Sequence, residues 1–189
     1  MDDSLRFAMS WDAFLKCIDE LKSFSDELND EWVLHKLHDG ENGAYLTKKV
    51  RRQTFSQIDG GLISFEENLL VDESVPVNGD VTTHEYHVVY SSSYACPVLC
   101  LNIWRSNGSL LTIEECWVKF SFSSDDKYNT LTQMEHPVLM KPFITLHPCK
   151  TAELIGTFGN SKNIVVSWLS TVGPVIGLNM LTDYARLTY

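Results

Sequence analysis

The chain has 189 residues, 44% hydrophobic and 11% aromatic, which is enough to bury the core of one domain. Fifteen lysine and arginine residues against 25 aspartate and glutamate give a net charge of -10, which argues against nucleic acid and anionic membranes as partners. The acidic start and five unevenly spaced cysteines predict a cytoplasmic protein with free thiols.

The first part of the chain predicts a helix and then a hairpin. Residues 11–28 carry apolar side chains at helical spacing behind Ser10, a favourable N-cap. Residues 31–38 and 44–52 are extended runs joined by a glycine-rich turn, as in a β-hairpin. The basic run 48–52 would guard a solvated sheet edge or dock an acidic partner.

The middle of the chain predicts a loop, two strands and a short helix. Residues 66–80 are acidic and lack a regular period, so we expect a flexible loop. Strands are predicted at 83–91 and 97–104. A capping box of Thr112 and Glu115 should start a short helix.

The C-terminal part predicts a proline-rich crossing and then helices. Prolines prevent a regular helix across 130–148, so we expect an extended connection over the core. Residues 163–182 carry no charge, but their polar side chains and the Gly173-Pro174 pair favour two short buried helices over stable membrane insertion.

Together these elements predict a single α+β domain over residues 1–189. It would contain an N-terminal helix, an antiparallel four- to five-stranded meander, the proline-rich crossing and C-terminal helices, with the flexible acidic loop at 66–80. The chain has no glycine-rich phosphate loop.

Most of the cysteines are expected in the core. Cys96 and Cys100 would lie about 13 Å apart along a strand at ~3.3 Å per residue, too far to share a zinc ion. Four cysteines are predicted to be buried, and they are Cys17, Cys96, Cys100 and Cys116.

Cys149 has the surroundings of a reactive thiol. Pro148 should hold His147 extended, so that the side chains of His147 and Cys149 point the same way. A following helix and Lys150 would favour the thiolate. These features make Cys149 a candidate nucleophile, with a buried thiol as the equally open alternative.

Residues 135–151 carry a resemblance to a known family, and they read EHPVLMKPFITLHPCKT. They resemble the active-site segment of the autophagy conjugating enzymes, distant relatives of ubiquitin-conjugating enzymes. The resemblance extends through residues 86–99 and 104–117. It implies a ubiquitin-conjugating-like fold and an E2-like transferase that holds a ubiquitin-like modifier as a thioester on Cys149.

The family has a branch that modifies a lipid headgroup and a branch that modifies a protein lysine. The short loop at 66–80, a first helix without a basic face and Thr151 in place of histidine resemble the protein-modifying branch. That branch implies an E1-like activating enzyme (autophagy-related protein seven), a modifier (autophagy-related protein twelve) and a target (autophagy-related protein five). The chemistry needs no metal, nucleotide or other cofactor on this chain.

Three residues are assigned to catalysis. Cys149 carries the acyl group, and His147 orients the thioester or polarises its oxygen, with a hydrogen bond that holds the loop as its alternative role. Tyr90 would help to admit the lysine, as would Tyr94, although core packing is an alternative for both tyrosines. Val138 stands where ordinary ubiquitin-conjugating enzymes have the asparagine of His-Pro-Asn, so that amide is missing.

Two other functions are less well supported. A papain-like peptidase has its base after the cysteine, whereas His147 is the last histidine of this chain. A non-catalytic module that only binds a ubiquitin-like protein would need no thiol at Cys149.

Overall fold

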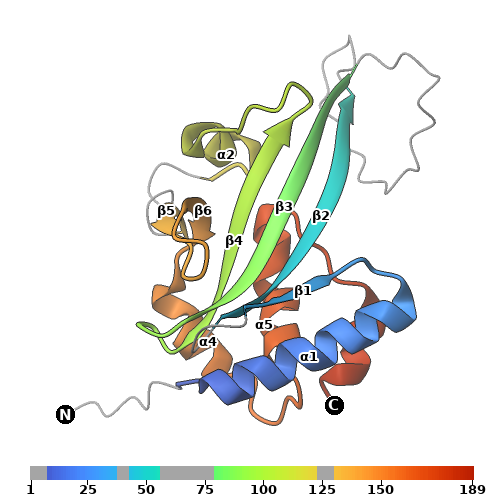
Figure 1. The fold of residues 1–189 in the computed structure, drawn as a ribbon, viewed down its shortest axis with the longest axis vertical. Coiled ribbons are helices and arrows are strands. Elements are labelled where there is room, and N and C mark those ends of the chain that lie inside the picture. The colour runs from blue at the N-terminus through green and yellow to red at the C-terminus, as the bar shows by residue number, and fades with distance from the viewer. Residues whose placement is uncertain (1–7, 38–42, 56–78, 123–129) are drawn as a thin grey trace.

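The computed structural model describes residues 8–37, 43–55, 79–122 and 130–189. Six antiparallel strands form one sheet in the order β1-β2-β3-β4-β6-β5, with helices packed against it (Figure 1). The predicted α+β class with an N-terminal helix and C-terminal helices is confirmed. The sheet is larger than the expected meander, and its last two strands add in reverse order.

The N-terminal helix and the first hairpin form as predicted. Helix α1 spans Trp11–Leu28, and the Ser10 side chain accepts a hydrogen bond from the Ala13 amide at 3.2 Å. Strands β1 (Val33–Lys36) and β2 (Ala44–Phe55) pair antiparallel. Most of the turn between these strands lies outside the described residues.

The central hairpin is longer than predicted. Strand β3 spans Gly79–Ser91 and pairs with β4, Cys96–Arg105, along ten residue pairs. Helix α2 (Ile113–Lys119) follows, and its capping box is present as expected. The predicted loop 66–80 lies outside the described residues except for its last two positions, which already belong to β3.

The connection expected over 130–148 is extended, but it also contains a hairpin that the sequence did not predict. Strands β5 (Leu131–Glu135) and β6 (Pro142–Leu146) form a hairpin, and β6 pairs with β4. The prolines fall at strand starts and turns, which are the places where a missing N–H group costs little. They mark the ends of strands here and do not exclude them.

The C-terminal part forms short helices that cover one face of the sheet. These are η1 (Pro148–Lys150), α4 (Thr151–Gly156), α5 (Ile164–Val172), η2 (Gly173–Ile176) and η3 (Thr182–Leu187). A Cβ atom on Gly173 would lie 2.5 Å from the Leu178 carbonyl oxygen, so this close approach requires glycine. No helix in the described ranges is both long and apolar enough to cross a bilayer.

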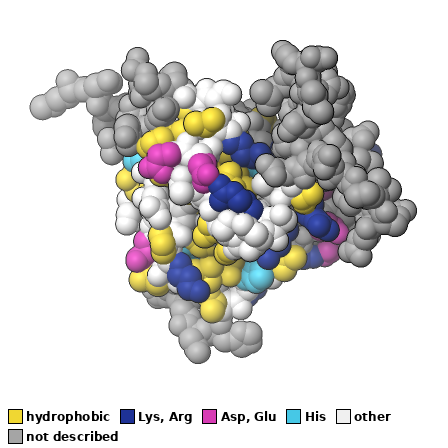
Figure 2. All heavy atoms as spheres, turned by 90° about the horizontal axis from the view of Figure 1, so that it is seen from above, with side chains coloured by type: hydrophobic (Ala, Val, Ile, Leu, Met, Phe, Trp, Pro, Cys, Tyr) yellow, Lys and Arg dark blue, Asp and Glu magenta, His cyan; other side chains and the backbone are white. Residues whose placement is uncertain are grey.

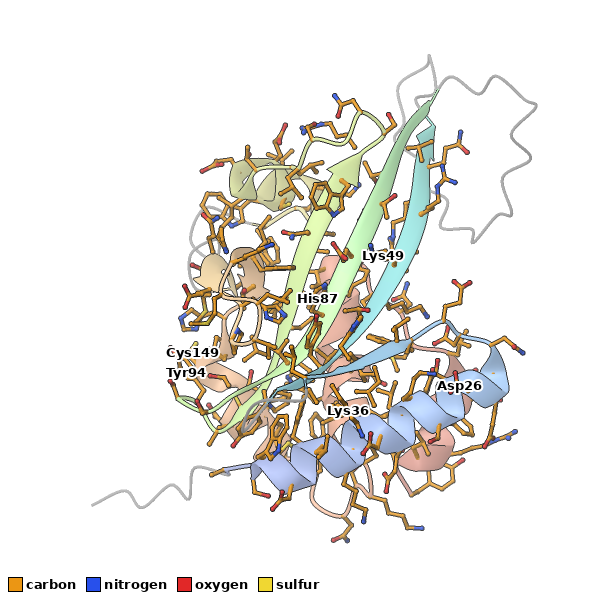
Figure 3. All side chains as sticks on the ribbon, in the orientation of Figure 1. Asp26, Lys36, Lys49, His87, Tyr94 and Cys149 are labelled. Atoms are coloured by element: carbon orange, nitrogen blue, oxygen red, sulfur yellow. The ribbon has the colours of Figure 1, made fainter. Side chains whose placement is uncertain are left out.

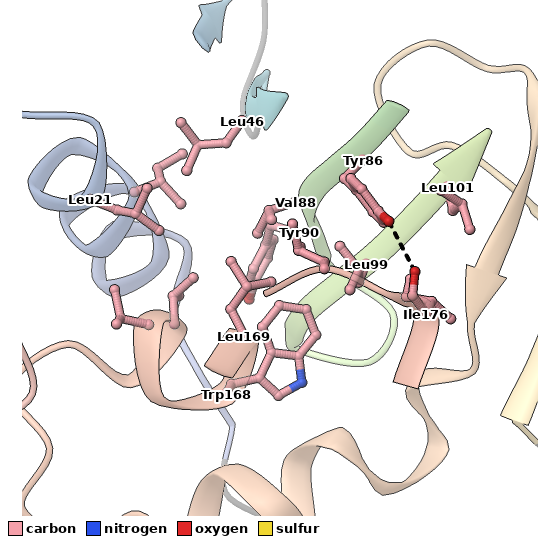
Figure 4. Packing of buried hydrophobic residues seen from close by; sticks show 14 of the residues in the cluster. Leu21, Leu46, Tyr86, Val88, Tyr90, Leu99, Leu101, Trp168, Leu169 and Ile176 are labelled. Atoms are coloured by element: carbon pink, nitrogen blue, oxygen red, sulfur yellow. Dashed lines mark hydrogen bonds between the residues drawn. The ribbon is translucent and has the colours of Figure 1, made fainter. Parts of the chain in front are cut away.

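The main core lies between this helical layer and the sheet. Side chains from α1, α5 and the strands interlock in it, among them Leu21, Leu46, Val88, Leu99, Trp168 and Leu169 (Figure 4). The Tyr86 hydroxyl donates to the Ile176 carbonyl at 3.0 Å and so ties β3 to η2. The helical layer therefore fixes the sheet from one side.

A second, smaller cluster lies on the opposite face of the sheet. It consists of alternate residues of four strands, Tyr45, Val89, Val98, Cys100 and Phe143, with Val138 and Leu139 packed against it. We call it the outer cluster. Alternation of side chains along each strand separates it from the main core.

The basic run 48–52 lies in the part of β2 that extends beyond β1, because β1 pairs only with residues 44–47. Within the described residues the run therefore pairs as a strand with β3 alone, which agrees with the sheet-edge position expected from the sequence. The run is divided between the two faces. Lys48 is buried and pairs with Asp30, whereas Lys49 pairs with Glu85 at 3.1 Å. Figure 2 shows basic side chains in separate groups among hydrophobic and uncharged ones on the visible face.

Candidate active site

Cys149 lies directly beyond the last strand of the sheet. Strand β6 ends at Leu146, and the chain continues through His147 into η1, which holds Cys149. This turn packs against β4, and the thiol residue is exposed. Figure 3 shows Cys149 at the edge of the molecule, next to Tyr94.

His147 caps the turn that carries the thiol. Its backbone is extended, with φ -62° and ψ 125°, as expected for a residue before proline. Its Nδ1 atom accepts a hydrogen bond from the Cys149 amide at 3.1 Å. Because Nδ1 accepts, neutral His147 carries its proton on Nε2 and can donate from there.

The other four cysteines are buried, as predicted: Cys17, Cys96, Cys100 and Cys116. Burial raises the pKa of the Cys100 thiol to about 12 and the pKa of both Cys96 and Cys116 to about 11. These thiols are therefore protonated at neutral pH as well as shielded. Cys149 is the one cysteine that a large substrate can reach.

The structure separates the two candidate tyrosines. Tyr90 is buried, its hydroxyl donates to the Met9 carbonyl at 2.7 Å, and its ring packs on Trp11 and Phe14. This geometry gives Tyr90 a packing role and does not support its assignment to substrate entry. Tyr90 lies on the same face of β3 as the core residues Tyr86 and Val88, and core packing is the alternative role that the sequence offered for it.

Tyr94 is the tyrosine beside the candidate site. It is 40% exposed, and its ring lies 6.3 Å from the His147 ring in an edge-on arrangement. The Met9 amide donates to the Ala95 carbonyl at 2.8 Å, which fixes the turn that carries Tyr94. The sequence signal for Tyr94 was its place in the same family-like segment as Tyr90.

The turn that follows β5 has no asparagine near the site. Val138 packs against the outer cluster, and its amide donates to His136 Nδ1 at 3.2 Å. The Leu139 amide donates to the same atom at 3.1 Å. His136 thus holds this turn from within, and no side-chain amide at position 138 can assist a thioester oxygen.

The dipole of the following helix, α4, gives the Cys149 thiolate little electrostatic stabilisation. Helix α4 has only six residues, and Lys150 is exposed to solvent. Within the part of the chain that the structure describes, no three His, Cys, Asp or Glu side chains group as metal ligands. The chemistry available at the site is that of an accessible thiol beside an imidazole.

A comparison with models of known protein families shows to which family the chain belongs. The model of a family described as the autophagocytosis-associated protein, active-site domain, matches residues 10–183. The chain belongs to this family. The match includes the whole sheet and the Cys149 turn, so the autophagocytosis-associated domain and its active-site region coincide with the fold described above.

Relatives in the autophagocytosis-associated family point to one branch. The ubiquitin-like-conjugating enzyme ATG10 of Homo sapiens is 41% identical over 121 residues, which cover 58% of this chain and 55% of that protein. ATG10 of Arabidopsis thaliana is 32% identical over 135 residues, 61% of this chain and 59% of the relative. The chain spans about half the length of these relatives.

A member of the other branch is more distant. Autophagy-related protein 3 of Schizosaccharomyces pombe is 22% identical over 140 residues, which cover 72% of this chain and 50% of that protein. The higher identity to the ATG10 proteins confirms the expected resemblance to ATG10 over autophagy-related protein 3.

Proposed function

We propose that this chain is an E2-like conjugating enzyme of autophagy that carries a ubiquitin-like modifier as a thioester on Cys149. One observation carries the proposal: among five cysteines, Cys149 alone is exposed, and it lies in the active-site domain of this family. The relatives are named ubiquitin-like-conjugating enzymes, which agrees with this chemistry.

The proposed cycle consists of two acyl transfers. The Cys149 thiolate attacks the thioester between the modifier and an activating enzyme, so that a new S–C bond forms and the activating enzyme's thiolate leaves. A lysine amine of the target then attacks the new thioester, an isopeptide bond forms, and Cys149 leaves as a thiolate while the amine loses a proton to solvent. A thioester is already activated, so neither step needs a cofactor on this chain.

His147 is proposed to assist by donating to the thioester oxygen. The cap on the Cys149 amide occupies Nδ1 and leaves the Nε2 proton available, which favours a donor over a general base. The same cap also holds the loop, so His147 has both of the roles considered from the sequence. Tyr94, beside the His147 ring, is placed to line the approach of the lysine.

The partners follow from the resemblance to the ATG10 proteins. We propose an activating enzyme of the autophagy-related protein seven type, autophagy-related protein twelve as the modifier and autophagy-related protein five as the target, in the cytoplasm. We propose that residues 1–189 form a single domain of this kind. The alternative is the lipid-modifying chemistry of the sister branch.

A discharge experiment tests the proposed function. The enzyme is charged with activating enzyme, modifier and ATP, and the thioester is then offered the target protein or vesicles that contain phosphatidylethanolamine. We expect transfer to the protein lysine and none to the lipid. Transfer to the lipid alone would assign the chain to the sister chemistry, and the absence of a thioester would refute the proposal.

A further inference from the structure

Two histidines meet beneath the turn that follows β5. His87, on the outer face of β3, is 4% exposed, and His136 is fully buried. His87 Nδ1 lies 3.1 Å from His136 Nε2, and the two residues are 49 positions apart in the chain. Figure 3 shows His87 in the middle of the sheet.

The direction of this hydrogen bond is determined by the backbone. His136 Nδ1 accepts from two amides, those of Val138 and Leu139, so it carries no proton. The proton of neutral His136 is therefore on Nε2 and is donated to His87 Nδ1. His87 must then carry its own proton on Nε2, so both imidazoles share one tautomer.

Glu85 faces the far side of His87. Its Oε1 lies 3.6 Å from His87 Nε2 and 3.1 Å from Lys49 Nζ, while its Oε2 accepts from Trp104 Nε1 at 3.1 Å. The His87 imidazole, followed by Trp104 and Lys49, lowers the pKa of Glu85 to about 2. A permanent carboxylate beside Nε2 favours the tautomer that donates toward it.

The hairpin that leads to Cys149 is joined to the rest of the sheet by few strand pairs. Within the described residues, β6 pairs with β4 through only Cys100 with Thr145 and Leu101 with Ile144. Phe143 of β6 packs against both imidazoles, with ring centroids 4.8 Å from His87 and 5.0 Å from His136. The imidazole pair is thus a second anchor between this hairpin and the sheet.

We propose that His87, oriented by Glu85, is a positioning residue that holds the β5–β6 hairpin and thereby sets the place of the Cys149 thioester. His87 touches no reacting atom. It acts through His136 and Phe143, at the opposite end of the strand from the thiol. The inference rests on the proposed function, because positioning matters only where an acyl group is transferred.

Displacement of the hairpin has a predictable cost. A shift of about 1 Å in a reacting group slows a transfer by roughly 100-fold. His87→Leu removes the acceptor for His136 but keeps an apolar side chain of similar size. His87→Asn restores an acceptor, since the amide oxygen lies close to the position of Nδ1.

The transfer test compares these two variants in single-turnover discharge of the preformed thioester to free lysine. His87→Leu should lower the maximal rate about 10- to 100-fold with an unchanged half-saturating lysine concentration, and His87→Asn should recover most of the rate. His35→Asn is the matched control, because His35 stacks at the other end of the same aromatic row and bonds Thr47. It should discharge at the wild-type rate.

Two results would overturn the inference. One is a wild-type rate for His87→Leu. The other is an equal loss of rate in His87→Leu and His87→Asn, which would leave only a packing role.

Nitrogen chemical shifts of the histidine rings test the network without any reaction. At neutral pH the shifts should show His87 and His136 both protonated on Nε2, and a proton on Nδ1 of His136 would refute the relay. If wild-type protein forms no thioester, the proposed function fails, while the ring shifts still decide whether the network exists.

Discussion

Buried neutral histidines should make the protein markedly less stable in mild acid. Burial, aided by Arg52 and Lys119, lowers the pKa of His84 to about 3. Burial and then His87 lower the pKa of His136 to about 4. Both side chains are fully buried, so these shifts are little screened by solvent. In the unfolded chain both histidines titrate near pH 6.5. At a pH below 6.5 the unfolded chain therefore binds protons that the folded chain does not bind.

The sign and size of this pH effect on stability follow from the linkage between proton binding and folding. Stability is complete above the unfolded pKa of about 6.5 and is lost as the pH falls toward the folded values. Between pH 7 and pH 5, each histidine lowers the free energy of unfolding by about 2 kcal/mol, or about 4 kcal/mol together. Glu85, with a pKa of about 2, contributes only about 0.2 kcal/mol there, because unfolded glutamate is still mostly ionised at pH 5.

Urea unfolding at pH 7 and pH 5 measures this effect. Wild-type protein should lose about 4 kcal/mol, and His84→Leu should lose about 2 kcal/mol less over the same interval, whatever its stability at pH 7. Equal stability of the wild type at both values would refute the reasoning. So would an unchanged pH dependence in His84→Leu, because the titrating group would then lie elsewhere.

Three further substitutions test individual contacts. His147→Ala should fold but slow discharge by roughly 10- to 1000-fold, and His147→Asn, which keeps the cap on the Cys149 turn, should fall between that variant and the wild type in single-turnover assays. Tyr90→Phe removes the hydrogen bond to the Met9 carbonyl and should lower the free energy of unfolding in urea by about 1 kcal/mol. It should discharge the thioester at the wild-type rate, and a slower rate would indicate that Tyr90 takes part in the transfer. Asp30→Ala should lower the free energy of unfolding by about 3 to 5 kcal/mol, because it leaves the charge of Lys48 buried without its partner. The double variant Asp30→Ala/Lys48→Met should recover part of this loss. Additive losses of the two single variants would contradict a coupled ion pair.

Local signals in the sequence predicted much of the fold. The N-cap at Ser10 and the capping box at Thr112 act within one helical turn, and both appear in the structure. The strand predicted at 83–91 is part of β3, where Tyr86, Val88 and Tyr90 alternate into the core. These features depend on neighbours a few residues apart, which the sequence shows directly.

Long-range pairing could not be predicted in the same way. The sequence predicted an extended connection at residues 130–148, but it gave no sign that two parts of that connection pair as a hairpin with Pro142 at the start of β6. The bond between His87 and His136 joins residues 49 positions apart and depends on the strand order. Cys149 could be proposed as the nucleophile from the sequence because it has a distinctive segment around it, but the place of Tyr94 beside His147 required the folded turn.

Mapping of the adduct tests the central assignment most directly. The protein is incubated with activating enzyme, modifier and ATP, and the products are separated with and without reductant and mapped by mass spectrometry. Wild-type protein should give a reductant-sensitive adduct on Cys149, Cys149→Ser a slow and reductant-resistant one, and Cys149→Ala none. Cys116→Ser, a buried control, should keep the adduct if it folds. An adduct that persists in Cys149→Ala, or that maps to another cysteine, would contradict the account.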